Sequence, residues 1–207
     1  MLHQVRKFTL VLATALVMLV PALAASAAVQ VGQAAPDFTV AGSDGKTYTL
    51  SQLRGQRVIL EWTNHDCPYV RKHYGSGNMQ ALQKEAAELG YVWLTVISSA
   101  PGKQGHVSAE KANKLTAKRD ASPAAVLLDE SGDVGRLYGA RTTPHMYVVD
   151  EDGTLLYAGG IDDKPTANPA DIDGATNYVR QAMAELAAGE SVSVSVSRPY
   201  GCSVKYN

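Results

Sequence analysis

Residues 57–70, RVILEWTNHDCPYV, decide how the chain folds. The run from Arg57 to Trp62 is mostly apolar and predicts a buried strand. A polar turn follows, and Pro68 suits the first turn of a helix, where its missing N–H is not needed. Cys67 therefore caps the predicted helix, where unpaired N–H groups and the positive end of the helix dipole favour the thiolate form.

The surroundings of Cys67 favour a reactive thiol over a buried structural cysteine. A core cysteine usually has apolar neighbours, whereas this one is flanked by Asn64, His65, Asp66, Pro68 and Tyr69. Three basic residues follow along the predicted helix and are expected to add positive charge near the thiol, namely Arg71, Lys72 and His73. The segment thus predicts a nucleophilic cysteine at a strand-to-helix turn.

A second segment, residues 141–150 (RTTPHMYVVD), places Thr143 and Pro144 directly before an apolar run. A Thr-Pro pair at the start of a buried strand is a candidate cis peptide bond. Residues 146–149 and 155–157 flank Asp152-Gly153, which predicts a β-hairpin.

Strand and helix patterns alternate along the rest of the chain. A first hairpin is predicted over residues 37–50, and further strands over 91–97 and 124–128. Helical patterns cover residues 79–89, 108–119, 133–138 and 177–187. Strands that alternate with helices and end in an antiparallel hairpin predict an α/β fold, with a central mixed β-sheet flanked by helices.

With its segments in this order, the chain resembles a redoxin domain, from the branch of the thioredoxin superfamily that holds peroxiredoxins and exported thioredoxin-like proteins. The resembling segments are residues 31–38, 50–55, 62–70, 128–132, 160–163 and the pair Thr143-Pro144. The resemblance implies a thioredoxin-like fold with an N-terminal β-hairpin. It also implies that Cys67 is the active-site residue and that Pro144 lies beside it in the cis form.

The sequence departs from both well-known subtypes of this superfamily. A dithiol thioredoxin has Cys-x-x-Cys, and here Val70 stands at the second cysteine. A typical peroxiredoxin has Pro-x-x-x-Thr-x-x-Cys, and here Leu60 and Asn64 replace the proline and the threonine that helps to hold peroxide. Asn64 is a candidate for a substitute hydrogen bond. Pro144 occupies the place of the peroxiredoxin arginine, and Arg141 is near but not equivalent.

The C-terminal tail, residues 191–207, carries the second cysteine. Val192, Val194 and Val196 alternate with serines, which predicts a strand that docks on a sheet edge. Gly201-Cys202 follows, and this tail is similar to the Gly-Cys segment that ends some redoxin proteins with Cys-Pro-aromatic-Val sites. That similarity implies a reversible disulfide between Cys202 and Cys67. Whether such a bond is catalytic or structural stays open at this point.

A metal site is the main alternative reading of the histidines. The residue after a cis-proline lies near the thiol in the resembling fold, so His65, Cys67 and His145 are candidates to converge. A thiolate with two imidazoles would suit copper or zinc. The exported copper chaperones of this fold carry a Cys-x-x-x-Cys plus His pattern, which this chain lacks. We therefore expect no metal or cofactor, and interpret the histidines mainly as tuners of the thiol pKa.

The first 27 residues have the order of a secretory signal peptide. Arg6 and Lys7 precede an uninterrupted apolar run over residues 8–20, and small residues follow. The alternative is an uncleaved membrane anchor, although the run is short for a span of ~20 residues. We expect cleavage and export to the periplasm or the exterior, where cysteines can form disulfides.

Composition limits the classes of function. The 207-residue chain has 19 Lys plus Arg against 20 Asp plus Glu, a net charge of −1. This balance gives no electrostatic footprint for nucleic acid. The 2 cysteines exclude a disulfide-rich scaffold and a four-thiolate zinc site. No Gly-rich phosphate loop or dinucleotide fingerprint occurs in the sequence.

These observations predict a signal peptide (residues 1–27), a redoxin domain (28–190) and a tail that carries Cys202 (191–207). The expected function is that of an exported thiol-dependent oxidoreductase with disulfide-exchange or antioxidant activity. In it Cys67 attacks protein disulfides or small peroxides, Cys202 resolves the intermediate, and an unidentified thiol supplies electrons. Thr143 and Pro144 complete the expected catalytic set. The expected supporting residues are Asn64, His65, Asp66, Pro68, Tyr69, Arg71, Arg141 and His145.

Two expectations concern alternatives and partners. The alternative function is a non-catalytic module that binds copper or a partner protein on the same scaffold. No nucleic acid is expected as a partner, and a membrane is expected only through the signal segment if that segment stays uncleaved.

Overall fold

The computed structural model describes Met1 and residues 29–207. Apart from Met1, the predicted signal peptide lies outside the described residues.

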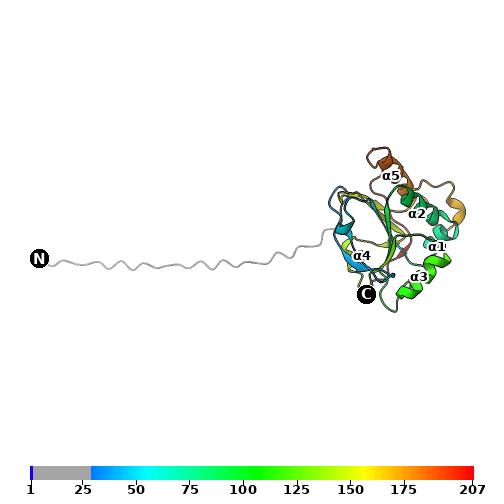
Figure 1. Ribbon diagram of the computed structural model, residues 1–207, viewed down its shortest axis with the longest axis horizontal. Coiled ribbons are helices and arrows are strands. Elements are labelled where there is room, and N and C mark those ends of the chain that lie inside the picture. Colours follow the sequence, from blue (N-terminus) through cyan, green and yellow to red (C-terminus); the bar gives the residue numbers. More distant parts are fainter. Residues whose placement is uncertain (2–28) are drawn as a thin grey trace.

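A five-stranded mixed sheet forms the centre of the molecule, in the order β5-β4-β3-β7-β8 (Figure 1). The strands β3, β4 and β5 are parallel, whereas β7 and β8 run antiparallel to their neighbours. Their bounds are β3 (Val58–Trp62), β4 (Val92–Ile97), β5 (Ala125–Leu128), β7 (His145–Val149) and β8 (Leu155–Gly159). The predicted α/β fold with a central mixed sheet is confirmed.

The two faces of the sheet are covered differently (Figure 1). One face packs against four helices, α1 (Pro68–Gly75), α2 (Asn78–Glu88), α3 (Ala109–Lys118) and α5 (Tyr178–Ala187). The short helix η2 (Pro169–Asp171) precedes α5. The opposite face packs against α4 (Asp133–Leu137), the helix η1 (Leu50–Leu53), and the predicted N-terminal hairpin of β1 (Thr39–Ala41) and β2 (Thr47–Thr49).

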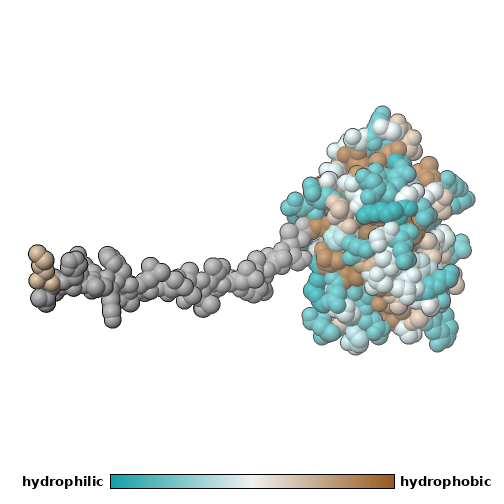
Figure 2. All heavy atoms as spheres, turned by 60° about the vertical axis from the view of Figure 1, so that its left-hand side comes forward, coloured by the Kyte–Doolittle hydropathy of each residue, from teal (hydrophilic) through white to brown (hydrophobic). Residues whose placement is uncertain are grey.

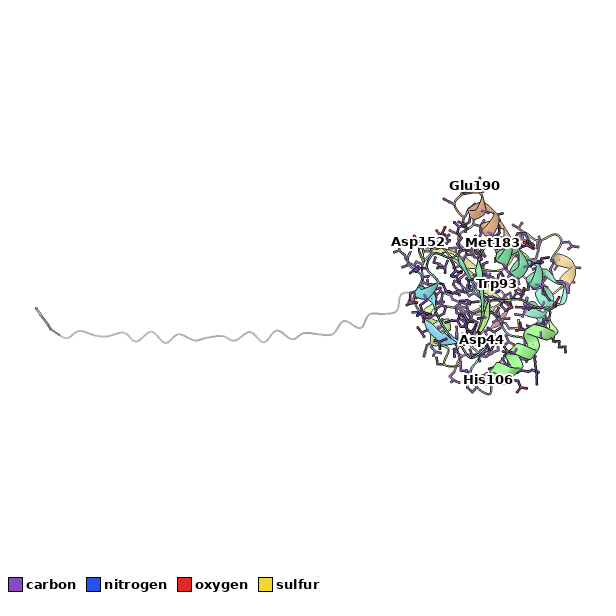
Figure 3. The ribbon with its side chains drawn as sticks, in the orientation of Figure 1. Asp44, Trp93, His106, Asp152, Met183 and Glu190 are labelled. Carbon is purple, nitrogen blue, oxygen red and sulfur yellow. The ribbon has the colours of Figure 1, made fainter. Side chains whose placement is uncertain are left out.

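Alternation along β3 divides the core in two, because successive residues of a strand point to opposite faces. Ile59 packs with the helices α1, α2 and α5, whereas Leu60 and Trp62 pack on the side of the hairpin and α4. Trp93 lies in the interior in Figure 3, while Asp152 lies at the periphery. Central strands buried on both faces explain why the sequence shows continuous apolar runs there.

Two of the helices begin at side-chain caps. Ser108 Oγ accepts a hydrogen bond from the Lys111 N–H at 3.3 Å, at the start of α3. Asn177 Oδ1 accepts one from the Arg180 N–H at 3.0 Å, at the start of α5. These caps satisfy N–H groups that have no partner within the helix.

The C-terminal tail differs in part from its prediction. Residues 192–196 form no regular strand, although the tail does reach the edge strand β8 through one bridge between Val196 and Ala158. Val196 is 64% exposed, and Ser193 bonds to Glu185 on α5 instead of continuing a ladder. The alternating valines therefore do not present one buried face, which a docked strand requires.

None of the described helices is long and apolar enough to cross a bilayer. Figure 2 shows hydrophilic and hydrophobic residues interspersed on the face that it presents.

Candidate active site

Cys67 lies where β3 turns into α1. It is the N-cap residue of α1, with Pro68 at the first helical position, as the sequence predicts. The Cys67 N–H donates to Asn64 O at 3.0 Å and closes the turn. Cys67 is 0% exposed. The thiol is therefore at a helix N-terminus but closed to solvent.

The loop before β7 supplies the partner of this thiol. The peptide bond between Thr143 and Pro144 is cis, which confirms that prediction. The Cys67 thiol donates a hydrogen bond to the Thr143 carbonyl, with 3.1 Å between Sγ and O. In this protonated form the thiol does not accept a capping bond from α1. Pro144 thus follows directly the residue that contacts the thiol.

The C-terminal tail brings Cys202 to the same place. The tail strand β9 (Cys202–Ser203) pairs antiparallel with β6 (Thr142–Thr143), and Cys202 lies opposite Thr143. Cys202 is half-buried against the core cluster that contains Cys67. Both cysteines are free thiols in this structure, within hydrogen-bonding reach of one another. Their disulfide stays a prediction, and the structure places the two residues where it could form.

Gly201 makes the close approach of the tail possible. Its φ is +128°, and a Cβ atom at this position would lie 2.1 Å from the Thr143 carbonyl oxygen. A residue with a side chain would clash there and would also be strained at this φ. Gly201 therefore lets β9 reach β6 next to Cys67.

The pKa values of the two thiols are shifted in opposite directions. Burial raises the pKa of Cys67, but hydrogen bonds from the Cys202 thiol, the Val70 and Cys202 N–H groups and the Thr143 hydroxyl outweigh it, and the net pKa is lowered. Burial, the hydrogen bond with Cys67 and the charge of Cys67 raise the pKa of Cys202 to about 11. Cys67 is thus the stronger nucleophile of the pair at neutral pH.

The basic residues of α1 act otherwise than the sequence predicts. Arg71 is exposed, and its charge is among the smaller effects that lower the pKa of Cys202. Lys72 and His73 are buried and turn toward Asp162. Burial lowers the pKa of His73 to about 4, so His73 carries no charge at neutral pH. Lys72 and His73 therefore do not supply the positive charge expected near the Cys67 thiol, and of the three only Arg71 acts on the thiol pair, through Cys202.

The polar side chains of the turn before Cys67 contact neighbouring protein groups and not the thiol. Asn64 Oδ1 accepts from the Asp66 N–H at 2.9 Å, and Asn64 Nδ2 donates to Gln104 O at 3.3 Å. Asn64 thus uses both ends of its amide away from the thiol, and the substitute hydrogen bond to a peroxide stays a prediction. His65 lies against Asp66, with 3.5 Å between Nε2 and Oδ2. Burial lowers the pKa of His65.

The remaining predicted residues divide between two sides of the sheet. Tyr69 is on the side of the thiols and packs edge-on against Tyr200, with ring centroids 5.8 Å apart. Arg141 O accepts from the Val204 N–H at 3.0 Å and so ties the tail. His145 stacks on Tyr147, with ring centroids 4.5 Å apart. Because Tyr147 belongs to the core under α4, the His145 ring lies away from Cys67.

The metal alternative needs histidines beside the thiol, and the described residues do not provide them. No group of three or more His, Cys, Asp or Glu side chains in that part of the chain is arranged to hold a metal ion. His145 fails to join Cys67 because alternate residues of β7 face opposite sides of the sheet. The three residues of the alternative, His65, Cys67 and His145, therefore do not converge in the described part of the chain.

Two buried polar clusters near the site escape sequence analysis. In one, Tyr200 of the tail meets Lys72, His73 and Asp162. Nothing in the sequence signals it, because two basic residues on an amphipathic helix ordinarily face solvent.

In the other, Glu61 of β3 accepts hydrogen bonds from Tyr74 (2.9 Å), Trp93 (3.0 Å) and Thr95 (3.0 Å). Burial raises the pKa of Glu61, and this effect outweighs the three hydrogen bonds, which lower it. The available signal was a single charged residue inside an apolar strand pattern.

Comparison with known proteins agrees with this geometry. A family model described as the AhpC/TSA family matches residues 31–158. The chain is 28% identical over 150 residues to the thioredoxin-like protein YneN of Bacillus subtilis (strain 168), covering 70% of this chain and 81% of the relative. It is 24% identical over 135 residues to the thiol-disulfide oxidoreductase ResA of Geobacillus thermodenitrificans (strain NG80-2), covering 62% of this chain and 68% of that relative.

A solved structure shares the fold over most of its length. A hypothetical protein from Sinorhizobium meliloti 1021 superposes with a TM-score of 0.70 at 22% identity, covering 87% of this chain and 97% of that one.

Proposed function

The chain belongs to the AhpC/TSA family, in the redoxin branch of the thioredoxin superfamily, and from that premise we propose an oxidoreductase in which Cys67 attacks the substrate and Cys202 resolves the intermediate. One observation carries this proposal: a thiol of lowered pKa at the N-cap position of α1 lies within hydrogen-bonding reach of a second thiol. Two such thiols exchange two electrons with a substrate by forming and breaking one disulfide.

With a disulfide substrate, the Cys67 thiolate attacks one substrate sulfur and forms a mixed disulfide, and the other substrate sulfur leaves as a thiolate that takes up a proton. The Cys202 thiol then loses its proton and attacks Cys67 Sγ. This step forms the Cys67–Cys202 disulfide and releases the second substrate thiol. The substrate is reduced by two electrons and the chain is oxidised by two, so an external dithiol must reduce the chain again.

Disulfides fit this site better than peroxides. Asn64, at the position of the peroxide-holding threonine, spends its amide on Asp66 and Gln104. With a peroxide, the Cys67 thiolate would instead attack one oxygen, giving a sulfenic acid and an alcohol or water. Cys202 would then condense with the sulfenic acid and release water. Both routes end in the same internal disulfide, so the substrate must be decided by rate.

The tail controls access in this proposal. Cys67 is 0% exposed, so a substrate sulfur reaches it only after β9 moves away from β6. A groove of about 540 Å³ borders the tail, lined among others by Tyr178, Arg198 and Gly201. This groove gives a polypeptide substrate room beside Cys202.

Export and domain limits belong to the same proposal. We place a cleaved signal peptide at residues 1–27, a redoxin domain at 28–190 and a resolving tail at 191–207. Secretion in a bacterial host, followed by mass analysis of the periplasmic product, tests the first limit. A product that keeps residues 1–27 in the membrane fraction would contradict cleavage.

Single-turnover oxidation tests the activity. Reduced protein is mixed with a model disulfide or with hydrogen peroxide, and the internal disulfide is followed by mass spectrometry. We expect a faster reaction with the disulfide, no oxidation in Cys67→Ser, and a trapped mixed disulfide in Cys202→Ser. Faster reaction with peroxide would reverse the substrate assignment. Stoichiometric copper or zinc with no turnover would instead support a binding module.

A further inference from the structure

A buried cluster of polar side chains fixes the tail two residues before Cys202. Lys72 and His73 of α1 are 0% exposed at their side chains, and Asp162 is 2% exposed. Lys72 Nζ lies 3.6 Å and His73 Nε2 lies 3.8 Å from Asp162 Oδ2. The Tyr200 hydroxyl donates to Asp162 Oδ1 and lies 3.2 Å from His73 Nε2. Tyr200 is thus the tail's contribution to a buried ion pair.

The hydrogen bonds of this cluster run in one consistent direction. Asn78 Nδ2 can only donate, so His73 Nδ1 accepts from it at 2.9 Å. The neutral His73 ring then carries its proton on Nε2 and donates to the Tyr200 hydroxyl. That hydroxyl in turn donates its own hydrogen bond to Asp162 Oδ1. Lys72 also donates to Lys164 O at 3.0 Å. The Tyr200 hydroxyl is the link that joins the His73 and Asp162 ends.

A phenylalanine at position 200 could keep the packing but not the link. The Tyr200 ring packs against Tyr69 at 5.8 Å and lies 5.7 Å from Lys72 Nζ. Loss of the hydroxyl would leave His73 Nε2 without its acceptor. It would also remove one of the two donors to Asp162 Oδ1, the other being the Lys164 N–H at 2.9 Å. Buried groups that lose a partner bear the full cost of desolvation. The hydroxyl is therefore the specific holding group of the tail here.

One helix connects this cluster to the nucleophile. Cys67 caps the N-terminus of α1, and Lys72 and His73 lie toward its C-terminus. Tyr200 holds the tail to α1, and β9 then carries Cys202 across to β6. Cys67 is held by the N-terminus of α1, and Cys202 is held through Tyr200 by residues near the C-terminus of the same helix. Cys202 therefore meets Cys67 in a fixed position.

We propose that Tyr200 is a positioning residue, whose hydroxyl in the Lys72–His73–Asp162 cluster holds Cys202 against Cys67 and so sets the stability of their disulfide. This rests on the proposed function of Cys202 as the resolving residue. A tail that is already ordered in the reduced protein loses little freedom when the disulfide closes. Without the hydroxyl, the tail must first become ordered, and the lost conformational entropy makes formation of the disulfide less favourable.

The test is the redox equilibrium of the full chain with glutathione, in native protein, Tyr200→Phe and a matched control. The control is Tyr138→Phe, which removes another buried hydroxyl, bonded to Pro36 O at 2.7 Å on the far face of the sheet. We expect the equilibrium constant for the Cys67–Cys202 disulfide to fall about tenfold in Tyr200→Phe, a rise in potential of ~30 mV for a two-electron couple. Tyr138→Phe should leave it at the native value.

A second measurement covers the case in which the equilibrium is obscured by unfolding. In the Cys202→Ser background, addition of Tyr200→Phe should speed alkylation of Cys67, because the loosened tail uncovers it while near-ultraviolet circular dichroism reports a folded core. An unchanged equilibrium in Tyr200→Phe, or an equal shift in Tyr138→Phe, would overturn the role of Tyr200. Absence of any internal disulfide in the native protein would instead overturn the proposed function, so the two failures are distinguishable.

Discussion

At the scale of single residues, burial and hydrogen bonding act on the Cys67 thiol in opposite directions. Burial raises the pKa of Cys67, and donors from three segments lower it by more. The donors come from α1, from the tail and from the loop before Pro144, so the acidity depends on tertiary contacts. The sequence predicted the N–H groups at the helix N-terminus, which include that of Val70, but not the donors from the tail and from Thr143; it also suggested the basic residues that follow Cys67.

The Thr143 hydroxyl gives a residue-scale prediction. Thr143→Val keeps the shape and the carbonyl but removes one group that stabilises the thiolate. We expect the pKa of Cys67 to rise by up to about one unit, because a hydrogen bond to a charged group is worth ~1.5 kcal/mol or more. The pH titration of thiolate ultraviolet absorbance measures it. Thr142→Val is the control, since the Thr142 hydroxyl donates to Pro144 O at 3.3 Å instead; equal shifts in both variants would contradict the assignment.

The sequence predicted that the two cysteines and the cis-proline lie together, but not their surroundings. Cys67 was identified from its strand-to-helix turn, and Pro144 and Cys202 were identified because the segments around them resemble those of redoxin proteins. The buried pairing of Lys72 and His73 with Asp162 was not, because the partners are about 90 positions apart and only the packed fold brings them together. Asn64 was correctly placed in the turn, but its amide is used by neighbours that the sequence does not single out.

At the scale of elements, the pairing of β6 with β9 holds Cys202 beside Cys67. Each strand has only 2 residues, and the pair holds because side contacts of the tail support it on both flanks. Tyr206, beyond β9, donates to Ala140 O at 2.7 Å. The helices and central strands were predictable from periodicity, since their apolar patterns span many residues. The serine–valine tail has the same alternation, yet its course follows individual polar contacts.

Gly201 gives the element-scale prediction. Gly201→Ala would place a methyl group against the Thr143 carbonyl and push β9 away from β6. We expect the internal disulfide to form at least tenfold more slowly after oxidation, as followed by mass spectrometry. Gly189→Ala is the matched control, because Gly189 also has a positive φ, +76°, but no atom within 4 Å of the added Cβ. Both variants bear the strain of a positive φ, of order 1 kcal/mol, and only one bears the clash. Equal rates in the two variants would show that β9 adapts.

At the scale of the whole molecule, two buried histidines tie stability to pH. Burial lowers the pKa of His73 to about 4 and the pKa of His145 to about 3. One lies under the tail and the other on the opposite side of the sheet, so both faces of the fold sense acid. An unfolded chain would protonate each near its ordinary value of ~6.5.

The sign of the effect follows from proton uptake. Between pH 6.5 and 4 the unfolded chain binds a proton at each histidine and the folded chain does not, so the free energy of unfolding falls as the pH falls. From pH 7 to 4.5 each histidine should contribute a loss of ~2 kcal/mol. Glu61 acts in the opposite sense, because its raised pKa lets the folded chain take up a proton first. A comparison of variants is therefore needed to isolate one histidine.

His145→Gln isolates that contribution, because His145 lies outside the cluster that holds the tail. Urea unfolding at pH 7 and at pH 4.5 measures how much free energy of unfolding each protein loses between the two pH values. We expect this loss to be ~2 kcal/mol smaller in His145→Gln than in the native protein. Tyr138→Phe is the control for loss of a buried polar group, since burial raises the pKa of Tyr138 far above this range; it should keep the native difference. A native difference in His145→Gln would mean that the folded chain protonates His145 as readily as the unfolded chain. That would require water to reach the ring beside Tyr147, which the 6% exposure of His145 opposes.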